Sequence, residues 1–332
     1  MIDLSDTITL LSLGAGVQST TLALLAEAGE IERPAAAIFA DTGDEPAKVY
    51  EHLERLRGMI SFPVHIVRVG KGLGADFLGA LSSETGSCGQ PPFYVRAPDM
   101  TPEEIEHVLC MPEPRPEDFP ASDAFFLSAD DSEQWGENDA FGQALYSHWA
   151  LRNKALRKDE GGMLWRKCTT DYKIIPIRRK ARLIMEAAGA RCIVQQIGIS
   201  TDEAERERTS DVQYIHNDHP LLRLGWSRAK CEAWLWERFS MRVPKSACRW
   251  CPYRSNAGWR AMKKDEPDEF ELACQFDEAI REAQGKKVNG AGIIGRLYVH
   301  RSFTPLRTAN LADLPGQRDF GFEQECHGMC GL

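Results

Sequence analysis

The chain has 332 residues, 43% of them hydrophobic, which is enough to bury the core of an enzyme-sized globular protein. Its net charge of -9 argues against a surface that grips nucleic acid throughout, so any polyanion must be met by a local basic patch. We find no apolar run of membrane-spanning length and no secretory signal, so we expect a cytoplasmic protein without a membrane partner.

The first part of the chain alternates between short apolar runs and segments with helical spacing. We predict strands at residues 8–13, 35–40 and 64–69, and helices at residues 20–28 and 47–57. This order predicts an α/β fold, a doubly wound and mostly parallel sheet with ligands at the carboxyl ends of its strands. Residues 1–70 are therefore the first half of a nucleotide-binding domain.

Prolines and acidic residues interrupt this pattern between residues 71 and 163. We interpret the stretch as an insertion with little regular structure, apart from a helix near residues 140–156. Regular order resumes in residues 164–240, the second half of the α/β domain. There we expect helices at residues 176–188 and 227–239 and a strand at residues 192–197. Residues 241–332 form a C-terminal cysteine-containing region and tail.

The turn after the first predicted strand reads GAGVQS and leads into a helix. Backbone N–H groups in such a turn form a cradle for anions, and the hydroxyls of Ser19 and Thr20 add donors. The turn matches neither of the common phosphate-binding fingerprints. From its residues alone, it is either an anion site or a plain connection between a strand and a helix.

Several segments, taken in order, resemble one enzyme family. SLGAGVQSTTLALLA at residues 12–26 resembles the PP-loop of the adenine nucleotide alpha hydrolase-like superfamily. Four further segments resemble the PAPS reductase branch of this superfamily: IFADTGDE (38–45), CTTDYKIIPIRR (168–179), IGISTDEAERER (197–208) and HPLLRLGWSRAKCEAWL (219–235). Because these matches are collinear over roughly two thirds of the chain, the sequence is identified as a relative of the PAPS reductases.

This resemblance implies a bound adenine nucleotide, either ATP or PAPS. The implied nucleotide-binding residues are Ser12, Gly14, Gly16, Gln18, Ser19, Thr20, Asp41, Thr42, Gly43, Glu203, Arg206 and Arg208. Gln18 departs from the ATP-cleaving members, which carry an aspartate there, and an amide is a poor ligand for Mg2+ on pyrophosphate. ATP cleavage is thus in doubt, although Asp41 still offers a carboxylate to Mg2+ or to a ribose.

Cys248 and Cys251 form a C-x2-C pair, the spacing at which two thiolates reach one metal. In the family, cysteines at these positions and at Cys168 hold a [4Fe-4S] cluster. Cys330 or Cys326 of the tail is the candidate fourth ligand, and we assign Cys330; an open iron, and zinc in place of iron, are the alternatives. Cys326 also resembles the mobile nucleophile of the reductase tail.

We assign catalysis to Cys326 and Lys173. The preferred function is reductive sulfur chemistry on PAPS or a similar adenylyl sulfate, with a thiol protein or a ferredoxin-like protein as electron donor. One alternative is an ATP-dependent iron-sulfur sulfur transferase that thiolates nucleic acid with a cysteine desulfurase as partner. The other is a nucleotide-binding sensor without catalysis, which the glutamine at position 18 motivates.

Overall fold

The structure is a computed structural model that describes residues 6–83, 88–96, 106–107, 110–115, 148, 162–283, 286–288, 291–293 and 295–312. Its centre is a parallel five-stranded sheet in the order β3-β2-β1-β6-β7. The strands are β1 (Thr7–Leu13), β2 (Ala36–Asp41), β3 (Val64–Arg68), β6 (Cys192–Gln196) and β7 (Ile215–Asp218). The chain runs outward from β1 to β3 and then resumes on the other side of β1. The predicted doubly wound α/β fold is confirmed.

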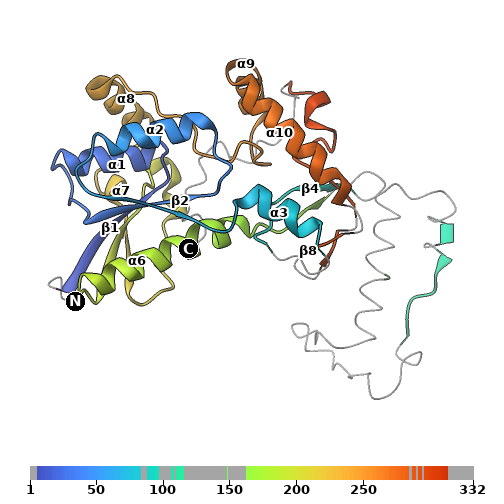
Figure 1. Cartoon of the computed structure of the whole chain (residues 1–332), viewed down its shortest axis with the longest axis horizontal. Coiled ribbons are helices and arrows are strands. Elements are labelled where there is room, and N and C mark those ends of the chain that lie inside the picture. Colours follow the sequence, from blue (N-terminus) through green and yellow to red (C-terminus); the bar gives the residue numbers. More distant parts are fainter. Residues whose placement is uncertain are drawn as a thin grey trace.

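Helices cover both faces of this sheet (Figure 1). They are α1 (Val17–Glu27), α2 (Ala47–Arg57) and α8 (Arg228–Phe239) on one face and α6 (Ile175–Ala187) on the other. Side chains of β1 alternate between the two faces, so Leu10 packs with α6 whereas Leu11 packs with α1 and α2. None of the helices in the described ranges has the length and apolar character that a membrane span requires.

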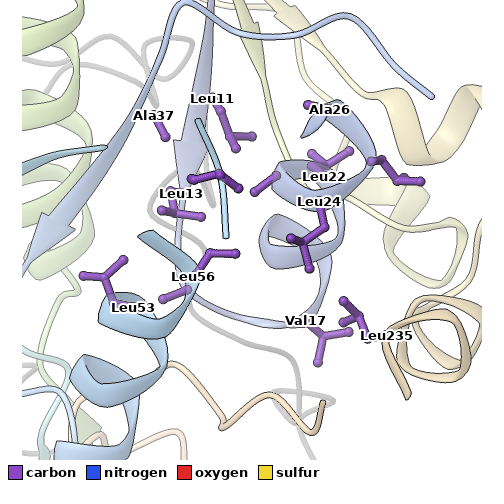
Figure 2. Packing of buried hydrophobic residues seen from close by; sticks show 14 of the residues in the cluster. Leu11, Leu13, Val17, Leu22, Leu24, Ala26, Ala37, Leu53, Leu56 and Leu235 are labelled. Carbon is purple, nitrogen blue, oxygen red and sulfur yellow. The ribbon is translucent and has the colours of Figure 1, made fainter. Parts of the chain in front are cut away.

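The helix α1 is buried on every side, between the sheet, α2 and α8 (Figure 2). It begins three residues before the predicted start at residue 20, since the helix already includes Val17. The misplaced start has a physical reason: Gln18 and Ser19 are polar and predict a turn, yet both are buried in the first turn of the helix. The predicted helix at residues 47–57 is confirmed as α2.

A second lobe joins the start of the predicted insertion to the C-terminal region (Figure 1). Its elements are α3 (Leu73–Leu81), β4 (Tyr94–Arg96), β5 (Gly162–Met163), α9 (Asn256–Asp265), α10 (Pro267–Ile280), β8 (Lys287–Val288), β9 (Ala291–Gly292) and β10 (Arg296–Tyr298). An antiparallel sheet β10-β4-β5 and the stacked rings of Trp250 and Phe276, 4.2 Å apart, hold the lobe together.

The expectation of little regular structure from residue 71 onward was therefore wrong for α3 and β4. The expected helix at residues 140–156 lies outside the described residues. Short elements complete the part of the chain that the structure describes: η3 (Thr170–Ile174), η4 (Thr201–Arg206), α7 (Pro220–Arg223), η5 (Arg281–Ala283) and η6 (Leu306–Thr308). The first of these, a π-helix, runs directly into α6.

Candidate functional site

The order of the strands reverses between β1 and β6, and in open α/β sheets ligands bind at the carboxyl ends of the strands beside such a reversal. The loop from Gly14 to Gly16 follows β1 and lies at this position. The loop after β6 approaches it closely, because a Cβ on Gly198 would lie 2.9 Å from the Ser19 nitrogen. Only glycine at position 198 allows this approach.

The loop after β1 has a strained and internally bonded backbone. Ala15 is fully buried with φ 56°, a conformation that residues with a side chain rarely adopt. The Gly14 N–H donates to Ser19 Oγ at 3.2 Å. At the start of α1 there is neither a side-chain cap nor an acidic residue in the first turn. The N–H groups there form the positive end of the helix dipole, which favours an anion.

The hydroxyl of Thr20 faces the core rather than the loop, since Thr20 Oγ1 lies 2.9 Å from His52 Nε2 of α2. Burial lowers the pKa of His52 to about 4, so its imidazole is neutral at pH 7. Ser12 is a buried residue of β1, paired in register with Ile38. A role for Ser12 or Thr20 in nucleotide binding stays a prediction.

The side chains of Gln18, in the first turn of α1, and Glu203 lie close together, although they are far apart in the sequence. Gln18 Nε2 lies 3.3 Å from Glu203 Oε2, and Gln18 Oε1 accepts from Arg228 Nη1 at 3.3 Å. Burial raises the pKa of Glu203, and its ion pair with Arg206 opposes this shift. Arg208 is not part of this group, because it is exposed and donates to backbone carbonyls of its own segment.

Asp41, at the end of β2, is buried in a separate network. Its carboxylate accepts from the Gly43 N–H at 2.8 Å, from the Tyr50 hydroxyl at 2.8 Å and from Arg68 Nε at 3.0 Å. Gly43 has φ +79°, and a Cβ there would lie 3.0 Å from the Gly72 Cα, so the turn requires glycine. Asp41 thus fixes the turn that carries Thr42.

A pocket lies beside this turn, between the sheet and the second lobe. It is lined by Thr42, Leu73, Pro91, Pro92, Arg166, Cys168, Thr169, Lys173, Cys248, Trp250, Cys251, Pro252 and Tyr253. The structure therefore brings together three of the four predicted metal ligands, the predicted catalytic lysine and Thr42. Cys326 and Cys330 lie outside the described residues.

Local structure explains how these side chains reach one pocket. The C-x2-C pair forms a tight turn in which the Cys251 N–H donates to the Cys248 carbonyl at 3.0 Å. Cys168 lies two residues before the π-helix η3, which carries Lys173. Single turns of π-helix are frequent at functional sites because the wider turn redirects a side chain.

Charges in the pocket are arranged around Lys173, whose Nζ lies 3.6 Å from Glu45 Oε1 with both side chains buried. Burial raises the pKa of the Cys248 thiol well above its usual range; the Glu45 carboxylate adds to this, and the Lys173 ammonium opposes it. A cation bonded to the sulfur would take the place of the proton and favour the thiolate.

Within the described ranges, no three His, Cys, Asp or Glu side chains converge on a position for a single metal ion. The thiols of Cys168, Cys248 and Cys251 nevertheless line the same pocket. Cysteine thiolates are the usual ligands of iron-sulfur clusters.

The loop and the pocket are directly connected. Ser246, which lies two residues before Cys248, donates a hydrogen bond from its Oγ to the carbonyl of Gly14. Next along the chain, the Arg249 N–H donates to the Asp44 carbonyl at 2.8 Å, in the turn after β2. Ser246 was missed at the sequence level, as were Arg228 and Glu45. Glu45 and Arg228 lie within the segments 38–45 and 219–235 that carry the family resemblance, and Ser246 lies just before the C-x2-C pair. Their individual contacts could not be predicted, because each joins segments that are distant in the sequence.

The fold and the site define a doubly wound α/β protein with a loop at its switch point and an adjoining pocket lined by thiols. Neither protein-family models nor curated protein sequences match the chain. Among solved structures, it is similar to the phosphoadenylyl-sulfate (PAPS) reductase from Candida auris in a phosphate complex. The TM-score is 0.31 and the identity 11%, over 73% of this chain and 75% of the other. This is a remote resemblance, and it does not establish the activity of this chain.

Proposed function

We propose that the chain is an enzyme of the PAPS reductase type, which binds an adenine nucleotide at the loop after β1 and reduces its sulfonate group beside the pocket. The observation that carries the proposal is the connection between Gly14 and the cysteine pair. Ser246 and Cys248, two residues apart, contact the loop after β1 and the turn after β2. A nucleotide phosphate on the loop would therefore lie next to the thiol-bearing segment.

Four of the five collinear sequence segments support the same proposal, because they meet at this end of the sheet. They carry the loop after β1, the turn after β2, Lys173 and Glu203. Cys168, Cys248 and Cys251 would hold a [4Fe-4S] cluster with Cys330 as fourth ligand, because Cys326 is the proposed nucleophile. When bound, such a cluster would supply a redox-active centre in the pocket. Lys173 would stabilise negative charge that develops on the transferred sulfonate.

In the proposed reaction, the Cys326 thiolate attacks the sulfur of the adenylyl sulfate. An S–S bond forms, the bond between sulfur and the phosphate oxygen breaks, and the nucleotide leaves with that oxygen. An external dithiol protein then attacks the thiosulfonate, releases sulfite and becomes a disulfide. The two electrons that reduce the sulfur thus come from the donor's two thiols.

The test is turnover of PAPS and of ATP by anaerobically purified protein. With PAPS and a reduced dithiol protein, we expect sulfite, and we expect Cys326→Ala to abolish it. Cys110→Ala is the matched control, because Cys110 is an exposed cysteine outside the site. Release of pyrophosphate from ATP without sulfite from PAPS would favour the sulfur transferase with its cysteine desulfurase. Binding without either product would favour a sensor.

A further inference from the structure

The amide of Gln18 is engaged at both ends. Its nitrogen lies 3.3 Å from Glu203 Oε2 and 3.4 Å from Ser200 Oγ, and its oxygen accepts from Arg228 Nη1 at 3.3 Å. The side chain is completely buried. These partners come from the segment after β6 and from the start of α8, so one amide ties both segments to the first turn of α1.

Two of the carboxylates at this end of the sheet are paired with arginine side chains. Glu203 pairs with Arg206, and Asp41 pairs with Arg68. A hard divalent cation on a nucleotide needs carboxylate oxygens with uncompensated negative charge. Over the part of the chain that the structure describes, no three acidic, histidine or cysteine side chains are arranged around such a position.

Positive charge at the loop comes from the protein itself. Arg228 is the first residue of α8, and its side chain is 30% exposed, donates to Gln18 Oε1 and also pairs with the exposed Glu232 of the same helix at 3.0 Å. The start of α8 is already capped, since Ser227 accepts from the Lys230 N–H and Asp202 accepts from the Arg228 N–H. The start of α1 has no such side-chain cap, which leaves its N–H groups to an anion.

We propose that the loop after β1 binds its nucleotide as a free anion, without a divalent cation, and that Gln18 and Arg228 determine this specificity. The proposal rests on the proposed function, in which an adenine nucleotide occupies the loop. Arg228 supplies the charge that a metal ion supplies elsewhere. Gln18 holds Arg228 in place through its oxygen and keeps Glu203 bonded to the protein through its nitrogen.

The choice of amide over carboxylate at position 18 follows from these contacts. Glu at this position would keep the shape of the side chain but place a second carboxylate at hydrogen-bond distance from Glu203. Two buried carboxylates in contact require a shared proton or a bound cation. Gln18→Glu is therefore expected to make the site dependent on a divalent cation, although it would strengthen the contact with Arg228.

The experiment is calorimetric titration of the full chain with adenosine 3′,5′-bisphosphate and with ATP, in EDTA and in MgCl2. For wild type we expect the same Kd in both buffers, within about twofold. Arg228→Gln should weaken binding about tenfold or more in both buffers, the size of a lost charge-assisted hydrogen bond. Gln18→Glu should bind about tenfold more weakly in EDTA than in MgCl2. Arg238→Gln, at the other end of α8 and paired with Glu30, is the control with unchanged Kd.

Wild-type binding that requires Mg2+ would overturn the inference while leaving the proposed function intact, and this comparison needs no variant. An unchanged Kd in Arg228→Gln, with the thermal unfolding of the variant like that of wild type, would also overturn it. Failure of wild type to bind either nucleotide in both buffers would refute the proposed function and the inference together.

Discussion

Thr42 Oγ1 and Cys248 Sγ lie 3.4 Å apart, so the turn that ends β2 contacts the first cysteine of the C-x2-C pair. Asp41 stabilises the same turn, because its carboxylate accepts a hydrogen bond from the N–H of Gly43. A group bound to the Cys248 sulfur would therefore lie next to the turn at the carboxyl end of β2. This contact joins the parallel sheet to the second lobe.

The first prediction concerns the three pocket cysteines. Anaerobically purified wild type should be brown and contain iron and sulfide, and Cys248→Ser should lose most of both, because a serine oxygen is a poor ligand for the cluster. Cys274→Ser is the control, since Cys274 is buried in the second lobe away from the pocket and should leave the iron content unchanged. A colourless wild type that contains zinc would contradict the cluster.

The second prediction tests the link between loop and pocket. Ser246→Ala removes the donor to the Gly14 carbonyl and should cost about 1 kcal/mol of unfolding free energy. Because it loosens the loop, it should also weaken nucleotide binding about fivefold. Ser255→Ala, which removes the N-cap of α9, should cost a similar unfolding free energy but leave the Kd unchanged. Equal effects of the two variants on the Kd would argue against the link.

The third prediction separates the structural and catalytic roles of Lys173. Lys173→Met leaves the buried Glu45 carboxylate without its ammonium and should lower the unfolding free energy by about 3 kcal/mol. The double variant Lys173→Met/Glu45→Gln should recover much of this stability in chemical denaturation, yet turn over no faster than the single variant. Recovery of turnover in the double variant would show that Lys173 acts only through the fold.

The fold and the site were predictable to different extents. Apolar runs such as residues 8–13 and 35–40 identified the parallel strands, because burial on both faces leaves a continuous hydrophobic signal. The helix α3 was missed, since Gly74 and Gly79 lower its helix propensity. Gly74 has a tertiary reason: a Cβ there would lie 2.8 Å from the carboxylate of Asp44.

In the site, spacing identified the cysteine pair and the family resemblance added Cys168 and Lys173, and all of these line one pocket. Arg228 lies within the segment 219–235 that carries the resemblance, but its role could not be predicted from the sequence, because its contact with Gln18 spans 210 residues. The left-handed backbone conformation of Ala15 could not be predicted either, because sequence rules assign this conformation to glycine.

The fourth prediction is a pH dependence of stability from His52. Burial lowers its pKa in the fold to about 4, below the ordinary value of 6.5, so the unfolded chain binds more protons between these values. The contribution of the neutral His52 to the unfolding free energy is fully present above pH 6.5. It falls by up to about 3 kcal/mol as the pH drops to 4. The stability advantage of wild type over His52→Gln should shrink across this window in chemical denaturation. A constant difference between the two would contradict the assignment.

The most direct measurement of the central claim is hydrogen exchange of the backbone amides, followed by mass spectrometry, with and without adenosine 3′,5′-bisphosphate. We expect the nucleotide to slow exchange at residues 14–19, in the loop and the first turn of α1, and at the start of α8. Protection confined to other segments, with exchange at residues 14–19 unchanged under saturating nucleotide, would show that the loop after β1 is not the nucleotide site.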